Sequence, residues 1–108
     1  MNEEIMDYWA LKEWETLIDA LMGEKEELWV LKEQYAEDSE RIIDETDFKE
    51  IYGRNNEGIR KMHVKQELHD DYVQIKKLEL SISRKEHRIS FLREMVRSRR
   101  VSLELLKK

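Results

Sequence analysis

Helix-breaking residues are almost absent from this chain, and this constrains its fold more than any other feature. None of the 108 residues is proline, and glycine occurs only at positions 23, 53 and 58. Proline interrupts helix interiors and glycine weakens them. Charged residues make up 42% of the chain, with Glu, Lys, Arg and Leu dominant, as is typical of long helices. The sequence therefore predicts one all-α domain covering residues 1–108.

Two segments repeat apolar residues every seven positions. In the first half the repeat is formed by Trp14, Leu21, Leu28, Tyr35 and Ile42. In the second half the repeat is stricter, and its members are Leu68, Ile75, Ile82, Ile89, Val96 and Leu103, with Val64, Leu78, Leu92 and Leu106 on the companion row. Sustained heptads predict coiled-coil packing. We expect one helix from about residue 3 to 45 and a second from about 56 to 106.

The segment 46–55 is predicted to reverse the chain. Thr46 is suited to cap a short helical turn that ends at Gly53, and Asn55 or Asn56 is suited to cap the second helix. The two long helices then form an antiparallel hairpin, with Trp14 near Leu92.

Charge is distributed unequally between the two halves. The chain carries a net charge of −5, but residues 1–50 hold 17 acids and 5 bases, while residues 51–108 hold 8 acids and 15 bases. An acidic helix beside a basic helix favours this pairing over the pairing of like helices.

Several apolar residues do not fit a single two-helix seam. They are Trp9, Trp29, Val73, Leu80, Phe91 and Val101. Small thin folds usually need additional packing, so we expect a homodimer that builds a four-helix bundle. The alternative is a lone hairpin whose spare surface binds a different partner.

Residues suited to catalysis or metal binding are not arranged for either task. The chain has no cysteine, and none of its three histidines follows a glutamate by three positions, as the ligands of carboxylate-bridged di-iron bundles do. The pairs Glu37/Glu40 and Glu67/Asp70 match the turns that hold magnesium in helical pyrophosphohydrolases, but such pairs arise easily in an acidic chain. We expect no catalytic residue, no metal and no cofactor, and hence no enzyme.

The predicted location is the cytoplasm. No apolar run approaches the roughly 18 residues needed to cross a bilayer, and the first residues lack the basic and apolar regions of a signal peptide.

A basic stretch in the second helix is the main candidate for nucleic-acid contact. Its members are Arg84, Lys85, Arg88, Arg93, Arg97, Arg99 and Arg100. Such a row can line a phosphate backbone. The opposing reading is that acids of the first helix neutralise it, and the overall acidity argues against general nucleic-acid binding.

The bend and the start of the second helix carry a resemblance. The stretch from Asp47 to Lys61, followed by His63 to Leu68, contains a Tyr-Gly-Arg-Asn-Asn-Glu turn before Arg60 and Lys61. It resembles small, mostly uncharacterised coiled-coil proteins encoded by bacteriophages and prophages, over roughly residues 46–97. The resemblance implies a phage origin, a bacterial host cytoplasm and expression with replication or recombination genes.

These observations favour a protein-interaction module that modulates or inhibits a bacterial protein, such as a DNA-processing or defence enzyme. Aromatic and arginine side chains are common interface anchors. The candidates for partner contact are Trp9, Trp29, Phe48, Tyr52, Arg54, Arg60 and Phe91. Arg54 and Arg60 have a second reading, as donors to the last carbonyls of the first helix. The alternative functions are a nucleic-acid-binding accessory of phage recombination or replication and a structural coiled-coil scaffold.

Overall fold

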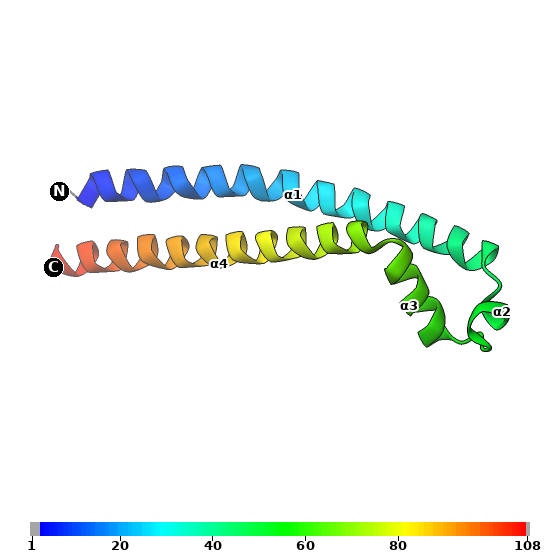
Figure 1. Cartoon of the computed structure of the whole chain (residues 1–108). Coiled ribbons are helices and arrows are strands. Elements are labelled where there is room, and N and C mark those ends of the chain that lie inside the picture. The colour runs from blue at the N-terminus through cyan, green and yellow to red at the C-terminus, as the bar shows by residue number, and fades with distance from the viewer. Residues whose placement is uncertain (1–2, 108) are drawn as a thin grey trace. The chain divides into compact units, whose positions relative to one another are not determined.

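The computed structural model describes residues 3–107, and side chains from Tyr8 onward. No strand occurs in this part of the chain, so the all-α prediction is confirmed. Figure 1 shows four helices in the order α1 (Glu3–Glu45), α2 (Phe48–Tyr52), α3 (Glu57–Glu67) and α4 (His69–Leu106). The bounds of α1 are those that the first apolar repeat predicts.

The chain divides into two compact units. Unit 1 contains Met1–Lys25 and Leu80–Lys108, and unit 2 contains Glu26–Glu79. Because α1 and α4 both extend through the two units, each unit has its own pairing between these helices. Unit 2 also contains α2 and α3.

The packed centre of unit 1 lies around Leu92. This side chain is 1% exposed and forms a cluster with Ala10 and Val96, against which Trp14 and Leu17 also pack. The predicted register, which pairs Trp14 with Leu92, is therefore confirmed. Only α1 and α4 contribute to this centre, so each buried residue has few neighbours and a large share of the stability.

Ion pairs in unit 1 show that α1 and α4 run antiparallel. Lys85 Nζ lies 2.8 Å from Glu24 Oε1, and Arg88 Nε donates to Glu13 Oε1 over 2.7 Å. From the first pair to the second, the residue number on α4 therefore increases while the residue number on α1 decreases. Exposed ion pairs contribute little stability, about 0–1 kcal/mol each. Their main effect is to select the acidic α1 as the partner of the basic α4.

The bend in unit 2 is built by helix caps. Asp47 caps α2, because its Oδ1 accepts from the Glu50 backbone N–H over 3.1 Å. Gly53 ends α2 with φ +72°, a left-handed conformation that costs glycine little. Asn56 caps α3 by accepting from the Ile59 N–H over 2.9 Å. The cap expected from Thr46 is wrong, since its hydroxyl donates to the Ile42 carbonyl instead.

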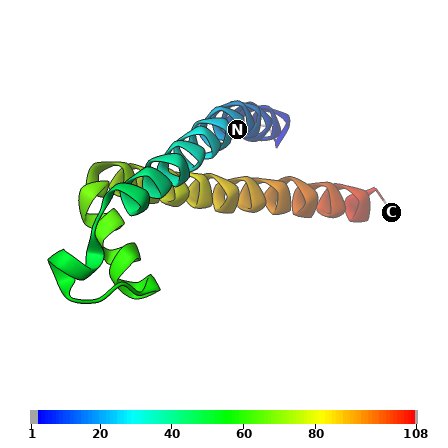
Figure 2. The same cartoon turned by 90° about the vertical axis from the view of Figure 1, so that its right-hand side faces the viewer.

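Aromatic contacts attach α2 to α3. Phe48 is 2% exposed, and its ring meets the His63 ring edge-on at a centroid distance of 5.3 Å. The Tyr52 hydroxyl and His63 Nδ1 are hydrogen-bonded at 2.6 Å. Both views accordingly show α2 beside α3 (Figures 1 and 2).

The second long helix is not continuous, and the prediction of one helix over 56–106 is wrong at one point. The backbone leaves helical geometry at Leu68, with φ −107° and ψ 33°, and this residue separates α3 from α4. No proline or glycine lies there. We attribute the break to competing contacts, because α3 is attached to α2 through His63 while α4 packs along α1. Asp70 and Asp71 lie in the first turn of α4, where carboxylates are favourable.

The predicted apolar rows of the second half are confirmed on both sides of the break, except at Leu106, which is 80% exposed near the end of α4. The buried members are Val64, Ile75, Leu78, Ile82, Ile89, Leu92 and Val96. Leu68 and Leu103, at the two ends of the main row, are half-buried. The heptad pattern therefore describes which residues are buried even where it fails to show the interruption of the helix.

Candidate interaction surfaces

One side of unit 1 combines exposed aromatic rings with an ion pair, and we call this set the aromatic face: Trp9, Glu13, Arg88 and Phe91. The Arg88 guanidinium is held by both carboxylate oxygens of Glu13, at 2.7 and 3.1 Å. It also lies over the Phe91 ring, 5.2 Å from the centroid. Arg88 therefore occupies a fixed position between the two helices.

Trp9 extends this face along α1. It precedes Glu13 by four residues, and positions four apart lie on the same side of a helix. Trp9 is 63% exposed and Phe91 is 57% exposed. Tyr8 packs edge-on against Trp9, with centroids 5.6 Å apart. Two large rings thus remain in solvent although neighbouring groups restrain them, which suits rings that bury against a partner.

The opposite side of α1 in unit 1 presents an apolar strip formed by Leu11, Ile18 and Met22. Met22 is 68% exposed, while the other two are between 39% and 45% exposed. Shallow grooves of about 260 to 350 Å³ run beside the strip. Glu15 and Asp19 line one of these grooves. The residues of α4 that line the others include Arg93, Arg97 and Arg100.

Trp14 lies at the base of the apolar strip with an unsatisfied polar atom. Its indole Nε1 is buried, and no described group accepts a hydrogen bond from it. The Arg93 guanidinium lies over the indole ring, 5.6 Å from the centroid. A buried N–H without an acceptor is costly, so this indole lowers the stability of unit 1.

The basic stretch of α4 does not act as one uniform row. Lys85 and Arg88 are engaged by Glu24 and Glu13, whereas Arg93 contacts Trp14. Arg84 is exposed and Arg99 is half-buried. Among the described side chains, no carboxylate forms an ion pair with Arg93, Arg97 or Arg100. A ligand bound beside the apolar strip would therefore meet the positive charges of these three arginines.

The remaining predicted anchors lie in unit 2 and have different environments. Trp29 is 62% exposed and therefore accessible. Phe48 is buried, because its ring fills the space between α2 and α3, and it is not accessible at the surface of unit 2. Tyr52 is half-buried and bonded to His63. Arg54 is exposed, and Arg60 donates to Asn55 Oδ1 over 2.7 Å, not to a carbonyl of α1.

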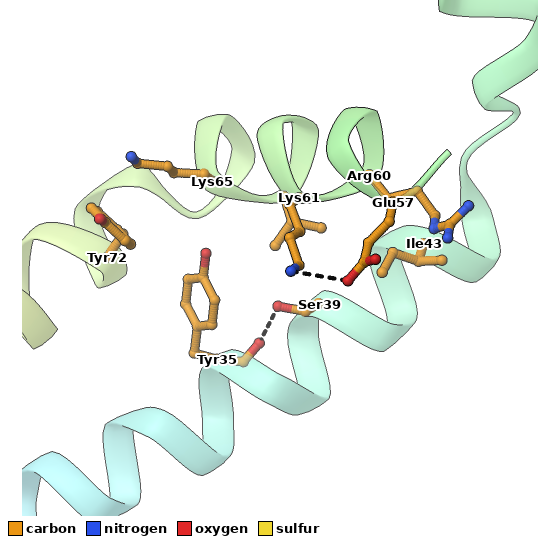
Figure 3. Close-up of a pocket in the computed structure, with 9 residues that line it drawn as sticks. Tyr35, Ser39, Ile43, Glu57, Arg60, Lys61, Lys65 and Tyr72 are labelled. Carbon is orange, nitrogen blue, oxygen red and sulfur yellow. Dashed lines mark hydrogen bonds and ion pairs between the residues drawn. The ribbon is translucent and has the colours of Figure 1, made fainter. Parts of the chain in front are cut away.

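Unit 2 contains the largest groove described, and sequence reasoning missed it. Its volume is about 450 Å³. Figure 3 shows side chains of α1 and α3 reaching toward one another across it, with Tyr72 of α4 at one end. The lining residues are Tyr35, Ser39, Ile43, Glu57, Arg60, Lys61, Val64, Lys65 and Tyr72. The available signal was Tyr35, which carries a polar hydroxyl in an otherwise apolar row.

The walls of this groove are apolar and its rim is basic. Arg60, Lys61 and Lys65 supply three positive charges, and Glu57 supplies the one carboxylate. Glu57 pairs with Lys61 at 3.0 Å, and a hydrogen bond from Lys61 lowers the pKa of Glu57. Desolvation raises the pKa of Tyr35, so its phenol is neutral at pH 7. The groove thus combines apolar surface with a net positive rim.

Searches for other kinds of site and for relatives found no match. Among the side chains that the structure describes, which begin at Tyr8, no group of three or more His, Asp or Glu is placed to hold a metal ion. No helix over residues 3–107 has a stretch long and apolar enough to cross a bilayer. Comparison with known proteins gives no matching family model, curated protein or solved structure.

Proposed function

We propose that this chain is a non-enzymatic interaction protein of phage type, which acts in the cytoplasm of a bacterial host. It binds a bacterial protein and modulates or inhibits it, and a DNA-processing or defence enzyme is the target class that we favour. The phage assignment is supported by the resemblance of the bend and of the second helix. The mode of action is supported by the surface of unit 1.

The single observation that carries this proposal is the aromatic face. Trp and Arg are enriched among the residues that dominate binding energy, especially when neighbouring contacts hold them in place. Here Arg88 is restrained by Glu13 and lies over Phe91, while Trp9 and Phe91 remain more than half exposed. Little side-chain entropy is lost when such a surface meets a partner.

The test is a pull-down from bacterial lysate with the tagged chain, performed with and without nuclease. We expect a stoichiometric protein that survives nuclease and whose affinity is then measured with purified components. Replacing either Trp9 or Phe91 by alanine should weaken that binding by about 30-fold or more, since each is expected to contribute about 2 kcal/mol or more.

The matched control is Ile51→Ala in unit 2, because Ile51 is an apolar residue with a similar exposure of 60%. This change should leave binding unaltered. Equal losses from the control and from the aromatic variants would refute the aromatic face as the binding surface. Recovery of nucleic acid alone would refute the protein-binding function itself.

We further propose that the chain forms a homodimer through the apolar strip, building a four-helix bundle. The strip is bordered by Glu15 and Asp19 on α1 and by Arg93 and Arg97 on α4. Twofold symmetry brings one patch onto the same patch of a second copy, so acids of one chain can meet arginines of the other.

Sedimentation equilibrium tests the dimer. The parent chain should have the mass of a dimer, while Ile18→Glu combined with Met22→Glu should give a monomer, because both changes place charge on the apolar strip. Thr16→Glu on an exposed position of the same helix is the control and should remain dimeric. A monomeric parent chain at high concentration would contradict this proposal.

A nucleic-acid-binding accessory of recombination or replication is the second candidate. It is favoured by Arg93, Arg97 and Arg100, which have no ion pair with a described carboxylate. Such binding should weaken steeply with salt, and the absence of any shift of labelled DNA at low salt would exclude it. A scaffold function would instead require assembly beyond a dimer.

A further inference from the structure

The groove of unit 2 has the size and lining of a small-molecule site. Ligand sites typically enclose about 300–1,000 Å³ and are mostly apolar, with a few polar groups that orient the ligand. At about 450 Å³ this groove lies within that range. Ile43 and Val64 supply aliphatic wall, and the rings of Tyr35 and Tyr72 supply flat wall. These walls favour an apolar body.

The rim decides the charge of the ligand. Lys61 is partly neutralised by Glu57, 3.0 Å away. Arg60 donates to the neutral Asn55 amide and also lies close enough to Glu57 to help lower the pKa of that carboxyl, while Lys65 lies over the Tyr72 ring at 4.4 Å. With three basic groups and one carboxylate, the rim still carries a net positive charge. An anion gains charge-assisted hydrogen bonds from such groups, whereas a cation is repelled.

We propose that this groove binds a small amphipathic anion: an apolar chain or ring system with one carboxylate. The apolar body lies between Tyr35 and Val64, and the carboxylate lies at the basic rim, where Arg60 and Lys65 mark the two ends of the groove (Figure 3). This site is separate from the aromatic face and the apolar strip, and it does not depend on the proposed function.

The test uses decanoate as the probe and follows the backbone amides of the full-length ¹⁵N-labelled chain by NMR. Below its micelle concentration, decanoate should produce saturable shifts that are largest in the segments 35–43 and 60–72. Decylammonium has the same chain length with the opposite charge, and it should bind at least about tenfold more weakly.

Two variants distinguish binding that depends on the charged rim from non-specific hydrophobic binding. Arg60→Gln combined with Lys65→Gln should weaken decanoate binding about tenfold or more, because both charge-assisted contacts are removed. Lys77→Gln is the control, since Lys77 is an exposed lysine of α4 outside the groove, and it should leave the affinity unchanged. Both changes are on surface positions, so the fold should persist.

Three results would overturn this proposal. The first is equal binding of decanoate and decylammonium, which would show that the groove does not discriminate between ligands by their charge. The second is shifts that concentrate at the apolar strip without saturation. The third is no shift in the segments 35–43 and 60–72 at millimolar decanoate. None of these results bears on protein binding by the aromatic face, so the two proposals fail separately.

Discussion

Replacing Leu92 by alanine removes the most deeply buried side chain of unit 1. Leu92 is 1% exposed and lies among Ala10, Val96 and Trp14. Replacement of a buried leucine by alanine costs the lost transfer free energy and a further amount for the cavity, about 2–5 kcal/mol together. The cluster is built by only two helices, so neighbouring side chains can partly close the cavity. We therefore expect a loss of about 2–3 kcal/mol.

The matched control is the same replacement at an exposed position of the same helix. Leu80 is 51% exposed, and its change to alanine should alter stability by less than about 0.5 kcal/mol. Both variants keep the composition change identical. Any difference between them therefore reports burial alone and not the helix preference of alanine.

The assay is urea unfolding followed by circular dichroism at 222 nm. For a small domain, the expected loss should lower the midpoint by roughly 1–2 M urea for Leu92→Ala. Each variant is measured at two protein concentrations, because association with a second copy raises apparent stability by mass action. Trp14 fluorescence, measured in a parent chain in which Trp9 and Trp29 are replaced by phenylalanine, gives a local second signal, since Trp14 packs against the same cluster.

Equal midpoints for the two leucine variants would refute the packing described for unit 1. The same conclusion would follow if Leu80→Ala were the more destabilising change. In either case the register that pairs Trp14 with Leu92 would have to be abandoned, and the placement of the aromatic face with it.

Two further predictions concern backbone conformation and acid stability. Gly53→Ala should destabilise the chain by about 1 kcal/mol because φ is +72° there. Gly23→Ala inside α1 should stabilise it by about 0.5–1 kcal/mol, because the added Cβ meets no neighbouring atom within 4 Å. Thermal unfolding of both variants checks this contrast, and equal effects would contradict it. The hydrogen bond from Lys85, assisted by Ser81, holds the pKa of Glu24 below its usual 4.5, so the stabilising effect of this carboxylate is complete above pH 4.5 and is lost as pH falls through the lower folded-state pKa. Glu24→Gln should therefore be less stable than the parent chain at pH 7, and the difference in unfolding free energy between the two should become smaller in acid. A difference in unfolding free energy that stays constant from pH 7 to pH 3 in urea unfolding would contradict this.

Much of the helical pattern could be predicted from the sequence because its causes are local. The seven-residue repeat specifies which side of each helix is buried, and the caps at Gly53 and Asn56 need only neighbouring residues. The same reasoning placed the cap of α2 one residue early, at Thr46 instead of Asp47. Both side chains are able to cap a helix, and which of them caps α2 depends on the backbone geometry at the bend.

The features that could not be predicted depend on contacts between distant segments. No helix-breaking residue lies at Leu68. We attribute the break there to the contacts of His63 with α2, which lie outside the local sequence pattern. The burial of Phe48 and the groove beside Tyr35 have the same origin. The aromatic face was predicted only as separate residues, since nothing in the spacing showed that Arg88 would link Glu13 to Phe91.

The position of the bend has a consequence for the order of folding. In unit 2, Tyr52 and His63 are separated by only 11 positions, whereas Glu13 and Arg88 in unit 1 are separated by 75. Closing a long loop costs more chain entropy than closing a short one, so contacts around the bend should form first. The distant ends are then brought together by a structure that already exists. The reverse process should begin at those ends, and amide protons near Trp9 should exchange with solvent well before those near Phe48.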